Sequence, residues 1–413
     1  MSRILAVSYG GGHAALIAPV VRELLRKGHD VTLIGLTTAH QYFTSNGLGC
    51  IGFSELLGQD NRDAYEIGYK LSQGMESGGS VRKEETIAYL GLSFQDMIAR
   101  LGVEKAWGEY QKKGRQAFLP IGVLERAIDR FQPDLILATN SPRAEQAAII
   151  AASKRSIPSV CIVDLFALQE VQWIGQAGYA TKVCVLNQAV KDMFLAHGRK
   201  GDEVVVTGNP AFDRLHDIEV VEAGKRMRQE RGWNDGKITL LWASQIEPEQ
   251  HPFAPIKGNP DLPRIIERVL REFVEDNKEF RLVVRYHPSE QVKFVEQRDV
   301  LFSPTSENLH VLLHAVDVVI VTASTVGLEA SLIGKPVLSV DCSIFTEDAP
   351  YSKMEISYGV SRPEELPLAI NTILLSRVAL QENETDLRGG CPVTSGKSAT
   401  INVVNVIESL FKH

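Results

Sequence analysis

Short apolar runs alternate with amphipathic, helix-like segments along most of this chain. The runs are rich in Val, Ile and Leu, which is typical of strands buried on both faces of a parallel sheet. Between them, apolar residues recur at helical spacing, as Leu16, Val20 and Leu24 do. The predicted strands are residues 3–8, 31–36, 134–139, 159–163, 182–186, 204–207, 238–243, 281–286, 316–321 and 336–340.

Two separate runs of these strand and helix units predict two doubly wound domains of the α/β class. The chain of 413 residues is also longer than one hydrophobic core usually supports. We expect a first domain at 1–215, with a helical insertion at about 53–120 that contains a mobile loop at 72–80, and a second domain at 216–395. Residues 396–413 form a closing helical segment.

Composition excludes several classes of protein. A hydrophobic content of 44% and a charged content of 23% are ordinary for a globular protein. The net charge of -7 argues against nucleic-acid binding, which needs a basic face. No apolar run is long enough to span a membrane, and the N-terminal apolar stretch is too short for a signal peptide, so we expect a cytoplasmic protein.

Neither the cysteines nor the main charged run predicts a site. The five cysteines are odd in number and show no Cys-x-x-Cys spacing, so they predict neither a disulfide framework nor a zinc site. The charged stretch at 225–231 is typical of a solvated helix face.

A glycine loop follows the first predicted strand and ends at His13. Gly10, Gly11 and Gly12 allow a sharp turn and bring backbone amides near a helix N-terminus, where negative charge is favoured. Since Pro19 fits only near a helix start, we expect the helix to begin just before it and His13 to lie in the loop. His13 is then a candidate proton acceptor. A plain strand-to-helix turn is the alternative.

The second half offers a phosphate-binding helix start. Ser324 and Thr325 follow a fully apolar strand, and free amides together with two hydroxyls at a helix N-terminus suit phosphate oxygens. Glu329 lies about one turn further on, where its carboxylate could accept hydrogen bonds from ribose hydroxyls. The alternative is an ordinary N-cap followed by a surface glutamate.

A histidine also follows a strand of the second half. Pro288 stops this strand, which places His287 at its carboxyl tip. Ser324 and Thr325 are expected at the same edge of the same sheet, so we predict that His287 joins them.

Together these features resemble the GT-B superfamily of nucleotide-sugar glycosyltransferases and its relatives, the UDP-N-acetylglucosamine 2-epimerases. The loop at 10–13 is similar to that of the glycosyltransferase that makes the lipid-linked peptidoglycan precursor, and segments 18–24 and 206–213 resemble segments of the epimerases. His287-Pro288 with Ser324-Thr325 resembles paired motifs of bacterial sialyltransferases and capsule polymerases.

The resemblance implies a GT-B architecture: two Rossmann-like domains that face a central cleft. Residues 395–400 are like the start of the terminal helix in polysaccharide-assembly transferases. That helix, at about 399–411, is then expected to cross back onto the first domain.

The chain departs from the epimerases at three places. Ser244 stands within 242–247, where they carry a histidine- and arginine-rich motif, and Ala323-Ser324-Thr325 replaces their Ser-Gly-Gly. Asp164 is the counterpart of their catalytic glutamate. We therefore expect a glycosyltransferase first and an epimerase or hydrolase second, with a non-catalytic nucleotide-sugar-binding protein as a third alternative.

The expected transferase moves a sugar from a UDP- or CMP/CDP-type donor to a glycan, lipid-linked or secondary-metabolite acceptor. It needs no metal or other cofactor, and peripheral contact with a membrane stays open. His13 is the expected base, with Asp164 as the second catalytic candidate. The expected donor-binding residues are Gly11, Gly12, Ser244, His287, Ser324, Thr325 and Glu329.

Overall fold

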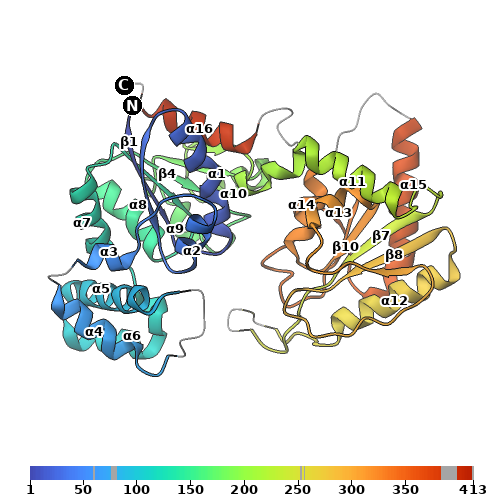
Figure 1. The fold of residues 1–413 in the computed structure, drawn as a ribbon, viewed down its shortest axis with the longest axis horizontal. Helices are drawn as coiled ribbons and strands as arrows, with labels where there is room; N and C mark the ends of the chain where they lie inside the picture. Colours follow the sequence, from blue (N-terminus) through green and yellow to red (C-terminus); the bar gives the residue numbers. More distant parts are fainter. Residues whose placement is uncertain (59–60, 76–80, 252–253, 255, 383–397, 412–413) are drawn as a thin grey trace. The chain divides into compact units, whose positions relative to one another are not determined.

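The computed structural model describes the chain apart from residues 59–60, 76–80, 252–253, 255, 383–397 and 412–413. The described residues form two compact units. The first contains Met1–Asp213 and the last helix, α16, and the second runs from Arg214 to helix α15. Each unit is built on one six-stranded sheet with helices packed around it (Figure 1).

All strand pairings within the two sheets are parallel. The first sheet consists of β1 (Arg3–Ser8), β2 (Asp30–Gly35), β3 (Leu135–Thr139), β4 (Ser159–Ile162), β5 (Lys182–Val185) and β6 (Val204–Val206). The second consists of β7 (Ile238–Ala243), β8 (Phe280–Arg285), β9 (Val300–Phe302), β10 (Val318–Val321), β11 (Val337–Val340) and β12 (Tyr358–Val360).

Helices connect these strands. The first unit contains α1 (Gly12–Arg26), α2 (Thr38–Ser45), α3 (Phe53–Leu57), α4 (Arg62–Ser72), α5 (Lys83–Leu101), α6 (Val103–Lys113), η1 (Gly114–Ala117), α7 (Ile121–Phe131), α8 (Ala144–Lys154), α9 (Val171–Ile174), α10 (Gln188–Ala196) and α16 (Ala399–Ser409). The second contains α11 (Ile218–Glu230), α12 (Leu262–Asp276), α13 (Leu309–Ala315), α14 (Thr325–Leu332), η3 (Pro363–Glu365) and α15 (Leu366–Glu382). The short helix η2 (Pro210–His216) includes the junction of the two units.

The structure confirms the ten strands expected from the apolar runs, with ends that differ by at most a residue or two. It adds β9 and β12, which are the outer strands of the second sheet. Both are only three residues long, and Leu301, Phe302 and Tyr358 in them are exposed. Short, half-exposed edge strands lack the continuous apolar run that reveals a buried strand.

The order of the strands locates the expected ligand sites. The first sheet has the order β2-β1-β3-β4-β5-β6, and the second has β9-β8-β7-β10-β11-β12. The chain reverses its winding between β1 and β3 in the first sheet and between β7 and β10 in the second. Ligands of doubly wound sheets bind outside the carboxyl ends of the strands at such points.

Helix α1 begins at Gly12, so the predicted start just before Pro19 is wrong. Pro19 lies inside the helix, and His13 is its second residue rather than a loop residue. Proline removes one backbone donor from the helix interior. The packing of Leu16, Val20 and Leu24 in the core offsets this loss.

The segment between β2 and β3 is helical, as the sequence predicts. Helices α4, α5 and α6 lie together at the end of the first sheet where β1 ends (Figure 1). Tyr9, just after β1, contacts Tyr89 of α5 with ring centroids 5.7 Å apart. Part of the mobile loop expected at 72–80, residues 76–80, lies outside the described residues.

The last helix, α16, packs on the first unit. Val403, Val404 and Ile407 are fully buried in the core that α1 also lines, and Figure 1 shows α16 beside α1. Asp213 caps α16: its carboxylate accepts hydrogen bonds from the backbone N–H groups of Ala399 (2.8 Å) and Thr400 (2.9 Å). The helix thus crosses back onto the first domain, as expected.

Replacing Asp213 with alanine should loosen α16. The substitution leaves two N–H groups of the first turn without their acceptor, which costs about 1 to 2 kcal/mol. Hydrogen exchange of α16 amides, measured by mass spectrometry, should become roughly 5- to 30-fold faster. The control is Asp217→Ala, because the Asp217 side chain makes no capping bond to α11, whose residues are all described. Equal exchange in the two variants would contradict the anchoring role.

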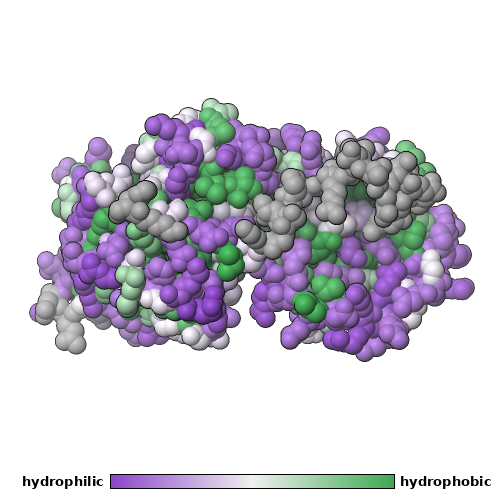
Figure 2. Space-filling model, turned by 90° about the horizontal axis from the view of Figure 1, so that it is seen from above, coloured by the Kyte–Doolittle hydropathy of each residue, from purple (hydrophilic) through white to green (hydrophobic). Residues whose placement is uncertain are grey.

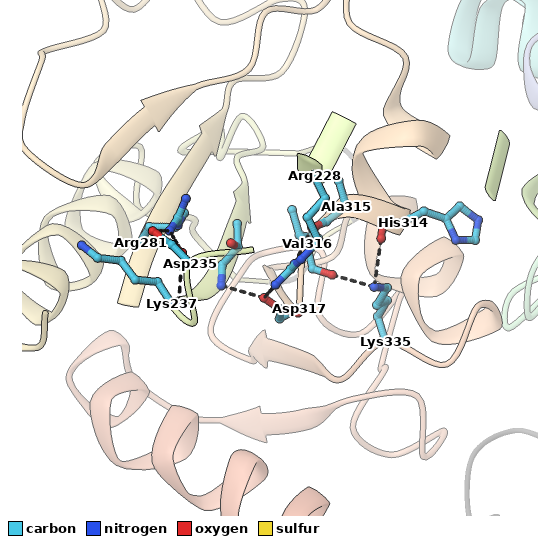
Figure 3. Close-up of polar contacts among 10 residues, drawn as sticks. Arg228, Asp235, Lys237, Arg281, His314, Ala315, Val316, Asp317 and Lys335 are labelled. Carbon is cyan, nitrogen blue, oxygen red and sulfur yellow. Dashed lines mark hydrogen bonds and ion pairs between the residues drawn. The ribbon is translucent and has the colours of Figure 1, made fainter. Parts of the chain in front are cut away.

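Polar contacts at the amino edge of the second sheet hold the elements of that unit together (Figure 3). Arg228 of α11 donates to Ala315 O (2.7 Å) and Asp317 Oδ2 (3.1 Å), and Lys335 Nζ donates to Val316 O (2.6 Å). The interpretation of 225–231 as a fully solvated face is therefore wrong for Arg228. Charged runs do not reveal which member reaches a neighbouring strand.

Figure 2 shows hydrophobic residues on one face as small, separate groups among hydrophilic ones. Among the described helices, none combines the length and the apolar character that a membrane crossing requires.

Candidate functional site

His13 lies at the carboxyl edge of the first sheet, where β1 passes into α1. Gly11 is the N-cap residue of α1, with a φ of 57° that favours glycine. A Cβ atom added at Gly11 or Gly12 would meet no atom within 4 Å, so a ligand could approach this backbone. Gly10 has a different role, because a Cβ there would lie 2.1 Å from Thr38 Oγ1.

Asp164 follows β4 at the same edge of the sheet and is held in place by two asparagines. Its Oδ1 accepts a hydrogen bond from Asn140 Nδ2 (3.0 Å), and its backbone N–H donates to Asn140 Oδ1 (3.0 Å). Asn209 donates through its side chain to the Asp164 carbonyl. Strand β3 lies between β1 and β4, so His13, Asn140 and Asp164 follow three strands that are adjacent in the sheet.

His13 and Asp164 interact electrostatically. Burial lowers the pKa of the His13 imidazole, and the Asp164 carboxylate opposes this shift by raising it. Within the described part of the chain, the buried Nδ1 of His13 has no hydrogen-bond partner. A neutral imidazole beside a carboxylate can accept a proton from a ligand, and the carboxylate stabilises the imidazolium that results.

Glu145 is a third ionisable group at this edge, which sequence analysis missed. It lies in the first turn of α8, is fully buried, and accepts a hydrogen bond from the Tyr9 backbone N–H (2.6 Å) at the start of the glycine loop. Burial raises the pKa of Glu145 to about 8, so the carboxyl group is largely protonated at neutral pH. A polar residue between Ala144 and Ala147 on a largely apolar helix was its only signal in the sequence.

In the second unit, Ser324 and Thr325 lie at the winding reversal between β7 and β10. Ser324 is the N-cap of α14, and its Oγ accepts a hydrogen bond from Val326 N (3.3 Å), so the N-cap alternative is present. Its hydroxyl hydrogen is still available to donate. Thr325 is exposed as the first residue of the helix, while Thr322 Oγ1 is buried without a hydrogen-bond partner among the described residues.

Glu329 faces a histidine. It is 7% exposed, and its Oε2 lies 3.2 Å from His310 Nε2 of α13. The alternative of a surface glutamate is therefore not found, while ribose binding by Glu329 remains a prediction. Although His310 Nε2 is close to Oε2, this oxygen is buried and makes no hydrogen bond among the described residues.

His287 is exposed at the end of β8, and β7 separates β8 from β10. It is thus at the same sheet edge as Ser324, but not on an adjacent strand. Its backbone N–H donates to Glu290 Oε2 (2.7 Å), and its Nδ1 accepts from Ser289 N (3.2 Å). The imidazole Nε2 remains available to a ligand.

Ser244, just after β7, belongs to a partly buried polar cluster that sequence analysis also missed. Ser244 Oγ donates to Glu290 Oε1 (2.9 Å), and Arg264 donates to both Ser244 Oγ (2.7 Å) and Glu290 Oε1 (2.8 Å). Because Glu290 also holds the backbone of His287, the cluster fixes the loops after β7 and β8. Ser244 therefore has a positioning role in addition to its predicted ligand contact.

Comparison with known proteins identifies the fold. No protein-family model and no curated protein sequence matches the chain. Among solved structures, the chain is similar to the UDP-GlcNAc 2-epimerase from Neisseria meningitidis bound to UDP-GlcNAc, with a TM-score of 0.58, 17% identity and full coverage of both chains. It is also similar to the UDP-GlcNAc 2-epimerase from Methanocaldococcus jannaschii, with a TM-score of 0.58, 12% identity, and coverage of 98% of this chain and 99% of that one.

The glycotransferase of kitacinnamycin is a third similar structure, with a TM-score of 0.54, 12% identity and 99% of each chain covered. At such identities the likeness establishes the fold and not the activity. It confirms the GT-B α/β fold that the sequence patterns predict.

Proposed function

We propose that this protein is a nucleotide-sugar enzyme that breaks the bond between the sugar and the phosphate, in the manner of a UDP-GlcNAc 2-epimerase or hydrolase. The observation that carries the proposal is the electrostatic interaction of half-buried His13 with Asp164 at the carboxyl edge of the first sheet. The similar epimerase structures support this class over simple transfer.

The chemistry of epimerisation suits two proton-transferring groups. Inverting a carbon next to the anomeric carbon requires a base that removes its proton and an acid that returns a proton to the opposite face. The electron pair of the broken C–H bond forms a double bond to the anomeric carbon, and the nucleoside diphosphate leaves with the electron pair of the bond between that carbon and its oxygen. Protonation of the double bond from the opposite face, with return of the diphosphate oxygen to the anomeric carbon, completes the epimerisation. We assign the proton transfers to His13 and Asp164.

The nucleotide is assigned to the second unit. Backbone N–H groups at the start of α14 and the hydroxyls of Ser324 and Thr325 suit its phosphates, His287 suits a phosphate oxygen, and Glu329 suits the ribose. The UDP moiety is supported by the neighbours whose structures contain UDP-GlcNAc, while a CMP- or CDP-type ligand remains part of the test.

A glycosyltransferase is the second candidate. The observation that favours it is the open backbone at Gly11 and Gly12, which leaves room beside His13 for a separate acceptor hydroxyl. In that reaction, His13 would take the proton of the acceptor as its oxygen attacks the anomeric carbon. The similar glycotransferase of kitacinnamycin has this type of fold.

Solvent exchange distinguishes the two candidates. The full chain is incubated with UDP-GlcNAc in D₂O, with and without candidate acceptors, and products are followed by NMR. An epimerase replaces the hydrogen at C2 of the sugar with deuterium and needs no acceptor. Release of UDP only when an acceptor is present, without deuterium at C2, would support the transferase instead. A parallel panel of CDP-, CMP- and GDP-sugars tests which nucleotide base the enzyme accepts.

Replacing both Ser324 and Thr325 with alanine should weaken nucleotide binding. Loss of hydroxyl donors to phosphate costs about 1 to 3 kcal/mol, which is roughly 5- to 150-fold in affinity. Titration calorimetry with UDP measures the change. Thr305→Ala with Ser306→Ala is a matched control, because both residues are exposed in the same unit. Unchanged affinity in the Ser324 and Thr325 variant would remove the phosphate assignment.

Activity should persist after chelation. In the proposed site, the charge of the departing phosphate is stabilised by the N-terminus of α14, its hydroxyls and His287. Turnover measured with and without EDTA should therefore agree. Inactivation by EDTA that added Mg²⁺ or Mn²⁺ reverses would contradict this assignment.

A further inference from the structure

A cavity of about 280 Å³ lies in the first unit, between the insertion helices and the loop after β3. Three cationic side chains line it, together with two amides and a single carboxylate. These are Arg100, Lys113 and Arg143, with Gln116, Gln146 and Glu109. The size suits a group no larger than a monosaccharide.

Two of the three cations already have carboxylate partners. Arg100 Nε donates to Asp96 Oδ2 (2.9 Å), and Lys113 Nζ lies 3.0 Å from Glu109 Oε2. The Arg143 side chain has neither an ion pair nor a hydrogen bond among the described residues. Its guanidinium lies over the Tyr9 ring, 4.8 Å from the centroid.

The conformation of Arg143 is constrained by its surroundings. Its φ of 73° and ψ of -104° are rare for a residue with a side chain, and such a conformation costs on the order of 1 kcal/mol or more. Glu145 is close but does not neutralise the guanidinium, because burial keeps its carboxyl group largely protonated at neutral pH. Arg143 is therefore a cation at the cavity that has no carboxylate partner among the described residues.

We propose that this cavity binds an anionic group, a carboxylate or a phosphate, carried by a sugar-sized molecule. A guanidinium stacked on an aromatic ring presents its N–H edge in a fixed plane, which matches two oxygens of such an anion. Lys113 and the two glutamines supply further donors. Arg143 also contacts Tyr9 at the start of the glycine loop, so one residue connects the cavity to that loop.

This anion site is separate from the nucleotide site assigned above to the other unit. The proposal that the cavity binds an anion does not depend on the proposed function. The use of the cavity as a second substrate site rests on that function. In a transferase, the molecule bound here would be an acidic acceptor.

Binding of small sugars to the full, unliganded chain tests the proposal. Titration calorimetry or ligand-detected NMR is performed with glucose 6-phosphate, glucuronate, inorganic phosphate and glucose. We expect at least one of the anions to bind at least tenfold more tightly than glucose, and a rise in salt to weaken it. Arg143→Gln should weaken this binding by a further tenfold or more.

Matched variants separate the site from general charge effects. Arg62→Gln removes an exposed cation from α4 of the same insertion and should leave the affinity unchanged. Lys113→Gln tests the same cavity should Arg143→Gln lose its native circular dichroism spectrum. Equal affinity for glucose and the anions, or equal losses in the cavity variants and Arg62→Gln, would overturn the proposal.

Competition with UDP distinguishes this proposal from the proposed function. Saturating UDP should not displace the bound sugar anion, and Ser324→Ala with Thr325→Ala should not weaken it. Displacement by UDP would show that the anion occupies a nucleotide-phosphate site and would also overturn the proposal. Retained anion binding with no activity on any nucleotide sugar would refute the proposed function alone.

Discussion

Replacing His13 with alanine is expected to lower turnover by about 10² to 10⁴, the usual contribution of a general acid or base. Nucleotide affinity should change little, because the residues assigned to the nucleotide lie in the other unit. Steady-state kinetics and calorimetry with UDP measure the two quantities separately. His197→Ala, which removes an exposed histidine at the end of α10, is the matched control.

The pH profile adds a readout that a structural role would not affect. Since burial lowers the pKa of His13, the acidic limb of the rate profile should lie below pH 6.5, the ordinary value for histidine. Asp164 raises this pKa, so Asp164→Asn should move the limb to still lower pH. Wild-type turnover in His13→Ala would exclude the base role. A loss of nucleotide affinity proportional to the loss of turnover would instead assign His13 to binding.

Replacing Glu145 with glutamine is expected to change the pH dependence of stability. Folding raises the pKa of this carboxyl group from 4.5 to about 8, so the folded state holds its proton more tightly than the unfolded state does. The contribution of the protonated carboxyl group to folding stability is fully present below pH 4.5 and is lost as pH rises through about 8. Glutamine keeps an acceptor for the Tyr9 N–H group without titrating.

Wild-type protein should therefore lose stability relative to Glu145→Gln as pH rises, by roughly 3 to 5 kcal/mol over the full range. Denaturant unfolding at pH 5 and pH 8.5, followed by circular dichroism, measures the difference. Glu84→Gln, which replaces an exposed glutamate of α5, serves as the control. Parallel stability profiles for wild type and Glu145→Gln would show that Glu145 is charged in the folded protein.

The fold and several positions at the carboxyl edges of the sheets could be predicted because they depend on local pattern. Apolar runs such as β7 and β10 are buried on both faces, so their character shows directly in the sequence, and the residues that follow them are assigned to one sheet edge by the parallel topology. The positions of His13, Ser244, His287 and Ser324 follow from this rule.

The partners of polar groups required the tertiary structure. Glu145 binds Tyr9 across 136 positions of sequence, and Arg228 reaches Asp317 across 89, distances at which no spacing rule applies. Pro19 lies inside α1 because core packing outweighs a lost backbone bond, and β9 and β12 exist because neighbouring strands pair with them. The sequence by itself thus determined the βα units and which residues follow each strand, because burial produces a periodic pattern of apolar residues along the chain. Tertiary structure alone decided which polar and charged groups meet, because those contacts depend on the order of the strands and on loops far apart in the chain.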